Sequence, residues 1–237
     1  MITVFPFDKL GSHNYGWLNA HYHFSFGNYY NIERCGFPPL LVWNDDLIQP
    51  GTGFPMHSHK DMEIITYIRQ GAITHEDSMG NKGVTRAGEI QIMSAGTGIT
   101  HSEYNYDNEE TLLFQIWIQP DRINLQPRWE NVDINFNNKM GINILASGQK
   151  GKLDEGIITI YQDATLYIIT GDQTHSTNFF LKDNRHTYSV VSTGRVIIND
   201  IMVNNRDGVY IEDEQELEFI FQGESEMILL DLPRQST

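Results

Sequence analysis

The chain has 237 residues, of which 40% are hydrophobic and 20% are charged, and this balance excludes a chain that is mainly disordered. The length allows either two domains or one large β domain. The formal net charge of −15 repels the phosphates of nucleic acids and anionic lipid surfaces, so we expect neither direct nucleic-acid binding nor membrane binding.

The expected compartment follows from three features of the sequence. The single cysteine, Cys35, cannot form an internal disulfide. The N-terminus lacks the basic, apolar and small-residue pattern of a secretory signal, and no apolar run approaches the roughly 18 residues of a membrane span. We therefore expect a cytoplasmic protein.

Short runs rich in β-branched and aromatic residues recur along the chain, separated by Gly, Asn and Asp. This pattern is typical of an antiparallel sandwich or barrel, and few stretches show helical periodicity. The sequence thus predicts an all-β fold. The predicted strands are 40–43, 63–68, 89–93, 112–118, 157–161, 166–169, 188–191, 195–198, 208–211, 217–221 and 227–230.

Residues 120–152 are poorer in strand signal and richer in Asn, Pro, Gly and charge, so a domain boundary is expected there. The prediction is an N-terminal domain over residues 1–130 and a C-terminal domain over residues 131–237. A faint internal repeat supports two similar β domains, because the segments 71–75 and 87–92 resemble 194–199 and 207–211. A duplicated barrel would explain this repeat.

Two compact clusters of histidines and carboxylates lie in the N-terminal half. His57 and His59 fall in the first cluster, and His101 and Glu103 in the second. Side chains two apart in a strand project from the same face, so each pair points in one direction, and two pairs facing each other across a barrel form a cage. Imidazole and carboxylate suit Fe, Mn, Ni, Cu or Zn, and four protein ligands on a six-coordinate ion leave two positions open.

Several residues near these clusters allow more than one interpretation. Glu63 is either a rival ligand or a partner that orients a ligand. It would share the face of His59 if the strand were unbroken. Asn105 is either such a partner or a turn residue. His75 either lines the mouth of a pocket or packs as an exposed polar residue.

The clusters and four further stretches resemble a known family. The first cluster resembles the first cupin motif, and Gly88–Asn105 resembles the second. The resemblance is strong from about Gly11 to Pro120 and weaker beyond. Four further stretches resemble the pirin family, and closely its bacterial quercetinase-like members, namely His23–Tyr30, Val42–Asp46, His75–Asn81 and Gln91–Gly98. Ser94 stands where a generic cupin often has proline, which agrees with the pirin pattern.

The resemblance implies two cupin-type jelly-roll β-barrels packed face to face, with metal in the N-terminal barrel only. It favours Glu103 over Glu63 as a ligand. The C-terminal half fits, because His175 and His186 form no His-x-His pattern and are expected to be surface or structural histidines. The implied cofactor is one divalent metal ion, usually Fe(2+), with Cu, Mn, Ni, Co and Zn as alternatives, and its implied ligands are His57, His59, His101 and Glu103.

The resemblance also implies a function, a quercetin 2,3-dioxygenase that opens a flavonol ring with O2. An open metal position beside a carboxylate fits oxygen chemistry, with Glu103 as the catalytic group that takes the proton of the substrate hydroxyl. The alternative is a redox-sensing regulatory module that acts through a protein partner, a role attributed to eukaryotic pirins. A third interpretation is a metal that only stabilises the barrel, and a monomer is the default expectation.

Overall fold

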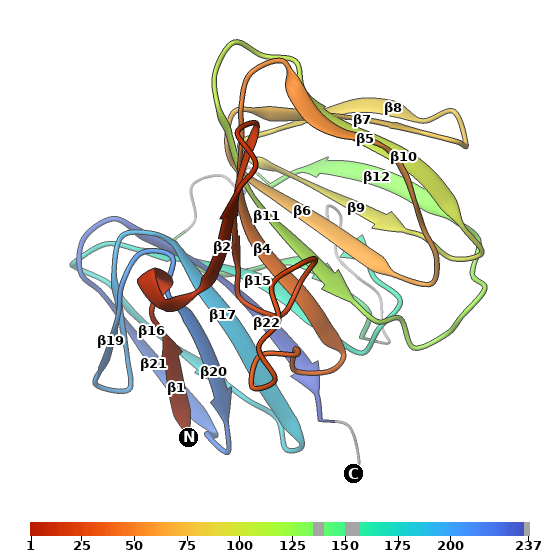
Figure 1. Cartoon of the computed structure of the whole chain (residues 1–237). Helices are drawn as coiled ribbons and strands as arrows, with labels where there is room; N and C mark the ends of the chain where they lie inside the picture. The colour runs from red at the N-terminus through yellow and green to blue at the C-terminus, as the bar shows by residue number, and fades with distance from the viewer. Residues whose placement is uncertain (135–139, 150–156, 235–237) are drawn as a thin grey trace. The chain divides into compact units, whose positions relative to one another are not determined.

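The computed structural model describes residues 1–134, 140–149 and 157–234. These residues form β-strands and one short 3-10 helix, Phe7–Lys9, and they contain no α-helix (Figure 1). The chain divides into two compact units. The N-terminal unit consists of Gly11–Asn135 and Ile160–Gln162, and the C-terminal unit consists of Met1–Leu10, Phe136–Thr159 and Asp163–Thr237.

The N-terminal unit contains two antiparallel sheets. The larger has seven strands in the order β12 (Arg128–Asp133), β9 (Glu89–Ser94), β6 (Glu63–Gln70), β11 (Thr111–Ile118), β4 (Leu40–Ile48), β3 (Leu18–Tyr22) and β2 (Gly11–Asn14). The smaller has four strands in the order β5 (Thr52–His59), β10 (Ile99–Asn105), β7 (Ala72–Asp77) and β8 (Lys82–Arg86). Apolar side chains from both sheets meet in one core, where Ala20 and Ile48 of the larger sheet pack with Ile73 of the smaller one.

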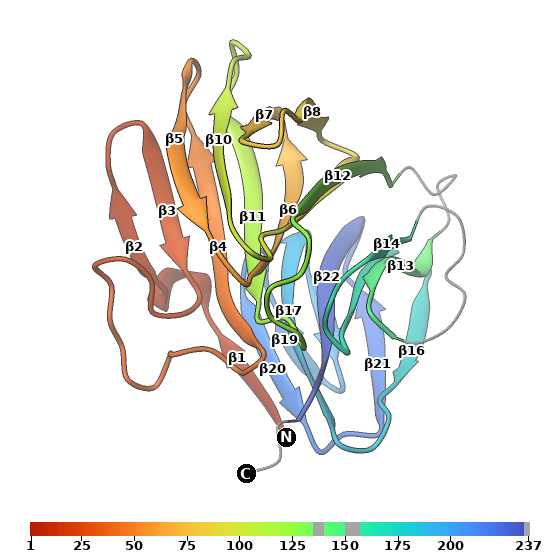
Figure 2. The ribbon, with the colours of Figure 1, turned by 90° about the vertical axis from the view of Figure 1, so that its right-hand side faces the viewer.

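The C-terminal unit also contains a seven-stranded and a four-stranded sheet. The larger follows the order β1 (Ile2–Phe5), β20 (Gly208–Glu212), β17 (Arg185–Thr193), β22 (Ser225–Pro233), β15 (Thr165–Gly171), β13 (Gly141–Ser147) and β14 (Ile158–Thr159). The smaller follows the order β16 (Ser176–Phe180), β21 (Glu216–Phe221), β18 (Val196–Ile198) and β19 (Ile201–Val203). Figure 2 shows β16 and β21 side by side.

The first strand belongs to the C-terminal unit, because β1 pairs with β20 in an antiparallel register with Ile2 opposite Ile211. The long-range pairing of β1 leaves no local pattern in the sequence. The predicted boundary itself stays a prediction.

Strands β4 to β11 and strands β15 to β22 have the same order in their sheets. The turns agree as well. Gly71 precedes β7 with a φ of 74°, and Gly194 precedes β18 with a φ of 78°. A Cβ would lie 2.9 Å from the carbonyl oxygen of Glu110 at Gly71 and 2.5 Å from that of Glu224 at Gly194. Both carbonyls directly precede corresponding strands, β11 and β22, which supports the internal duplication that the sequence suggests.

The prediction of an all-β fold with two cupin-type barrels is confirmed, and each of the eleven predicted strands overlaps an observed one. The stretch 120–152 is less irregular than predicted, because it contains β12 and β13. Among the described residues, no helix is long and apolar enough to cross a membrane.

Candidate metal centre

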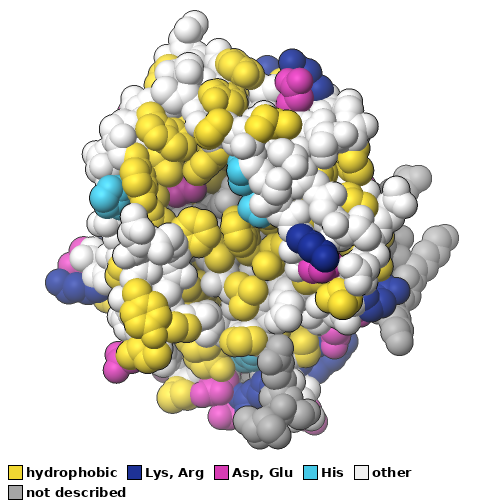
Figure 3. Space-filling model, turned by 45° about the vertical axis from the view of Figure 1, so that its right-hand side comes forward, with side chains coloured by type: hydrophobic (Ala, Val, Ile, Leu, Met, Phe, Trp, Pro, Cys, Tyr) yellow, Lys and Arg dark blue, Asp and Glu magenta, His cyan; other side chains and the backbone are white. Residues whose placement is uncertain are grey.

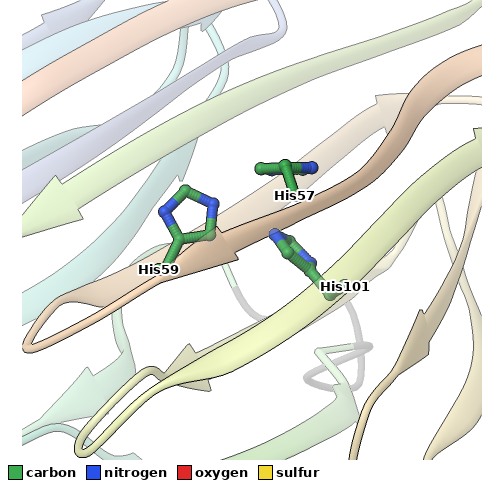
Figure 4. Close-up of side chains that lie close together, drawn as sticks. All are labelled: His57, His59 and His101. Atoms are coloured by element: carbon green, nitrogen blue, oxygen red, sulfur yellow. The ribbon is translucent and has the colours of Figure 1, made fainter.

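Three histidines converge at the end of β5 and on the neighbouring strand β10 (Figure 4). The register places His101 opposite His57 and Ile99 opposite His59. One ring nitrogen from each histidine lies within 4.8 Å of the others. The structure therefore brings the three histidines together, but the two clusters lie side by side on hydrogen-bonded strands, and the expectation that they face each other across the barrel is wrong.

The environment keeps the imidazoles of His59 and His101 neutral. Burial, followed by the charges of His57 and His75, lowers the pKa of His101 to about 3. Burial and the charges of His101 and His57 lower the pKa of His59 to about 4. Both rings are therefore unprotonated at neutral pH, which leaves each a lone pair for a metal ion.

The hydrogen bonds indicate which nitrogen atoms are free. A carbonyl oxygen only accepts, so the 2.7 Å contact between Nδ1 of His57 and the carbonyl oxygen of Pro55 makes Nδ1 the donor, and in the neutral imidazole the lone pair then lies on Nε2. In His101, Nε2 is buried and has no hydrogen-bond partner. Burying a nitrogen atom without a hydrogen-bond partner costs free energy, so a metal ion bound to Nε2 of His101 fits the site.

The carboxylate of Glu103 is buried and held by two side-chain amides. Gln91 donates to Oε1 at 2.6 Å, and Gln115 donates to Oε2 at 2.9 Å. An irregularity in the pairing of β10 with β5 lies between His101 and Glu103. A Glu103 oxygen lies within 4.8 Å of nitrogen atoms of His101 and His75, whereas the group with His57 and His59 does not include it. Glu103 therefore lies beside the three histidines, next to His101.

Gln91 and Gln115, which hydrogen-bond the carboxylate of Glu103, were not among the residues expected at the site from the sequence. They belong to a row of cross-strand partners on β4, β11, β6 and β9, in which Asn44, Gln115, Thr66 and Gln91 follow one another. All four are buried, and Gln91 also donates to Thr66 at 3.3 Å. The available signal was a lone glutamine within an apolar strand, as in Thr111–Ile118, because an inward-facing polar residue in such a run needs a buried partner.

His75 on β7 is fully buried, so the interpretation as an exposed polar residue is wrong. Its Nε2 lies 3.0 Å from Oδ2 of Asp77, and its Nδ1 lies 3.3 Å from Nδ1 of His101. Burial alone would raise the pKa of Asp77, but hydrogen bonds from His75, Asn81 and Met79 outweigh it and lower that pKa.

Glu63 lies outside both groups of described side chains that could hold a metal ion. It begins β6 in the larger sheet, whereas His59 ends β5 in the smaller one, so no unbroken strand joins them. Its Oε2 accepts hydrogen bonds from Ser94 at 2.9 Å and from the backbone of Tyr161 at 3.2 Å. Burial raises the pKa of Glu63 to about 7, although these hydrogen bonds oppose the shift. Glu63 is therefore a buried structural carboxyl group in this arrangement.

Asn105 has a structural role. Its Nδ2 donates to the backbone oxygens of Ile48 and Glu109 at 3.2 and 2.7 Å, and its Oδ1 accepts from the backbone of Asp107 at 3.0 Å. Of the two interpretations, the turn residue is the one observed.

A cavity of about 300 Å³ lies beside His57 and His59 within the N-terminal unit. Figure 3 shows a hollow with a largely hydrophobic wall, histidine side chains at its edge and an acidic side chain inside. Burial, together with the charges of Asp45 and Glu103, raises the pKa of Asp46 well above its usual value. The cavity is lined by Tyr15, Trp17, Leu18, Ala20, Tyr22, Phe26, Gly27, Asn44, Asp46, Phe54, His57, His59, Gln115 and Trp117.

The corresponding strands of the C-terminal unit carry no such centre. Phe179 on β16 and Leu217 and Phe219 on β21 are buried in an apolar core. His175 is half-exposed and pairs with Asp172 at 2.7 Å. Among the described residues, both groups of side chains that could hold a metal ion belong to the N-terminal unit.

Comparison with known proteins identifies the family. Residues 6–118 match the family described as Pirin, and residues 144–232 match the family described as Quercetinase C-terminal cupin domain. A Pseudomonas aeruginosa protein provisionally named quercetin 2,3-dioxygenase is 47% identical over 233 residues, covering 98% of this chain and 100% of that protein. The protein named Quercetin 2,3-dioxygenase from Escherichia coli K12 is 41% identical over 234 residues, covering 98% of this chain and 99% of that protein.

A solved structure agrees. Bacterial pirin YhhW from Escherichia coli in complex with nickel(II) has a TM-score of 0.93 and 39% sequence identity, covering 99% of this chain and 100% of that chain. The cupin fold, the histidine cluster and this nickel complex together support a divalent metal at the site. The chain belongs to the pirin family, close to its bacterial quercetinase-like members.

Proposed function

We propose that this protein is a quercetin 2,3-dioxygenase that uses one divalent metal ion, with Fe(2+) as the first candidate, to open a flavonol ring with O2. The observation that carries the proposal is the convergence of His57, His59 and His101 beside a cavity with aromatic walls. Relatives that carry the quercetinase name support the same activity.

The proposed ligands are His57, His59, His101 and Glu103. Of the four, Glu103 has the least direct support as a ligand. Its carboxylate lies in a group with His75 and His101 and not in the group of His57, His59 and His101. Oε1 of Glu103 accepts hydrogen bonds from Gln91 at 2.6 Å and from the Thr66 hydroxyl at 3.5 Å, whereas Oε2 accepts from Gln115 at 2.9 Å and keeps a further lone pair. Glu103 therefore retains the capacity to bind a cation or to accept a proton.

A divalent metal ion bound at this site would supply open coordination positions for an ionised substrate hydroxyl and for O2. In the proposed reaction, Glu103 takes the proton of the flavonol 3-hydroxyl group, O2 adds to the substrate, and the heterocycle opens with release of carbon monoxide. Gln91 and Gln115 hold the Glu103 carboxylate in place for this proton transfer.

The cavity fits a small, flat, aromatic substrate. Trp17 and Phe54 pack edge to face at 5.1 Å, and Trp117 packs edge to face against His59 at 4.9 Å. These side chains would bind an aromatic ring system and exclude water next to the histidines. The volume of about 300 Å³ is at the lower end of small-molecule pockets, which favours one flavonol-sized ligand.

The test is a flavonol turnover assay on protein loaded in turn with Fe, Cu, Mn, Ni and Co, with bound metal quantified in each sample. We expect loss of flavonol absorbance in air and none without O2. His57→Ala should abolish this loss, whereas His175→Ala, a change of the half-exposed histidine in the C-terminal unit, should preserve it. Failure of every metal-loaded sample to consume the flavonol in air would contradict the proposal and favour the regulatory alternative. Cytoplasmic location, a monomeric state and a protein partner stay predictions.

A further inference from the structure

A buried chain of hydrogen bonds leads from the β7–β8 turn to His101. Oδ1 of Asp77 accepts the backbone N–H groups of Met79 and Asn81 at 2.9 and 3.1 Å. Oδ2 of Asp77 accepts from Nδ2 of Asn81 at 2.9 Å and lies 3.0 Å from Nε2 of His75. Nδ1 of His75 then lies 3.3 Å from Nδ1 of His101.

The direction of each hydrogen bond follows from the turn. A carboxylate with donors on both oxygens acts as an acceptor, so Nε2 of His75 carries a hydrogen and donates to Asp77. In a neutral imidazole, the other nitrogen is then an acceptor. Nδ1 of His75 therefore accepts from Nδ1–H of His101, and the hydrogen of His101 is absent from Nε2, the atom that is buried without a partner.

We propose that Asp77 and His75 are positioning residues that fix the tautomer of His101, so that its Nε2 lone pair is available to the metal ion. This inference rests on the proposed role of His101 as a ligand. A ligating histidine usually donates its second N–H directly to a carboxylate or carbonyl group. Here a second histidine carries that interaction from the carboxylate to the ligand.

The same geometry argues against His75 as a ligand, although it lies near His101 and Glu103. Both ring nitrogens of His75 are engaged, one with Asp77 and one with His101. Its ring also stacks on Trp129 at 4.7 Å with an interplanar angle of 8°, which restrains rotation. His75 thus contacts the ligand and not the ion.

Nitrogen-15 NMR of the metal-free wild-type protein tests the tautomers directly. We expect the hydrogen of His75 on Nε2 and the hydrogen of His101 on Nδ1. A hydrogen on Nε2 of His101 would overturn the proposal. This measurement needs neither a bound metal ion nor turnover.

Asp77→Asn is the sharpest variant. The backbone N–H groups of Met79 and Asn81 hold the amide oxygen at the Oδ1 position, so the amide NH2 takes the place of Oδ2 and donates to His75. His75 would then carry its hydrogen on Nδ1, and His101 would carry its own on Nε2. We expect both tautomers to reverse and the affinity for Ni(2+) or Fe(2+) to fall by about 10- to 100-fold.

The chain offers a matched control in Asp172→Asn, which changes the Asp172–His175 pair of the C-terminal unit. This control should leave the metal affinity unchanged. A second variant, His75→Phe, keeps a ring against Trp129 but removes both nitrogens, and it should also weaken metal binding. Wild-type affinity and unchanged His101 tautomer in folded Asp77→Asn protein would overturn the proposal. If Asp77→Asn does not fold, the wild-type spectrum still decides.

These experiments can fail independently of the test of the proposed dioxygenase function. Absence of flavonol turnover with normal metal binding and the expected tautomers would remove the dioxygenase proposal and retain this one. Turnover with the opposite tautomers would do the reverse.

Discussion

Trp117 donates a hydrogen bond from its indole Nε1 to the side-chain oxygen of Gln115 at 3.1 Å. This bond orients the amide of Gln115, whose Nε2 donates to Glu103. Trp117 also lines the cavity next to His59. The cavity wall and the proposed catalytic carboxylate are therefore connected through one glutamine.

Replacing Gln115 tests this connection. Gln115→Leu removes one of the two amide donors to Glu103 and leaves the Trp117 indole without its acceptor. We expect flavonol kcat to fall by about 10-fold or more, since loss of a partner that orients a metal-site residue costs that much. Steady-state kinetics with quantified metal would measure the effect, with Gln119→Leu at an exposed position as the control. Wild-type kcat in Gln115→Leu would exclude the connection.

Glu103→Gln separates proton transfer from metal retention. The change keeps the size of the side chain but removes the carboxylate, so at saturating metal we expect turnover to fall by about 100-fold or more, the range for loss of a general base. The three histidines should still retain a metal ion, with weaker affinity. Glu109→Gln, at an exposed position, is the matched control. Undiminished turnover in Glu103→Gln would rule out the base role.

The sequence predicted the fold well where patterns are local. The strand Thr111–Ile118 follows from its β-branched and aromatic residues, and the grouping of His57, His59 and His101 follows from their spacing. The sequence did not predict that the two clusters lie on neighbouring strands, because the order of strands in a sheet depends on long-range pairing.

The buried polar groups around the site were also beyond sequence analysis. Gln91 and His75 lie in ordinary strand segments, and their roles depend on partners 12 and 26 residues away along the chain, Glu103 and His101. The pattern alone left Glu63 open as a ligand, although the family resemblance favoured Glu103. The structure places Glu63 in the seven-stranded sheet of the N-terminal unit and Glu103 in the four-stranded sheet.

Glu63 should make stability depend on pH. Its pKa is raised by burial from 4.5 to about 7 in the folded protein, so the folded state binds its proton more tightly than the unfolded state. The contribution of Glu63 to the free energy of unfolding is therefore greatest at low pH. This contribution falls by about 3 kcal/mol in total as pH rises from about 4.5 to 7.

Glu63→Gln mimics the protonated group, because its amide oxygen can still accept from Ser94 and from the backbone of Tyr161. Chemical denaturation at several pH values should show a smaller loss of stability between pH 5 and about 7.5 in this variant. An unchanged pH dependence would contradict the structural role of Glu63. Loss of bound metal in Glu63→Gln would instead revive Glu63 as a ligand.

Gly53 permits the close approach of β5 to β10. A Cβ at this position would lie 2.2 Å from the carbonyl oxygen of Glu103 and 2.5 Å from Cα of Tyr104, and neither backbone atom can yield easily. Gly53→Ala should therefore push the two strands apart, destabilise the protein by about 1–3 kcal/mol and weaken metal binding. Thermal unfolding and metal titration would measure both effects. A variant with wild-type stability would show that the strands adjust freely.

Anomalous diffraction from crystals of metal-loaded protein would locate the bound ion. We expect one strong peak in the N-terminal unit, roughly 2.0–2.2 Å from Nε2 of His57, Nε2 of His101 and a ring nitrogen of His59, with a Glu103 oxygen completing the protein ligands. A peak at another group of side chains, or no peak at these histidines in fully loaded protein, would contradict this expectation.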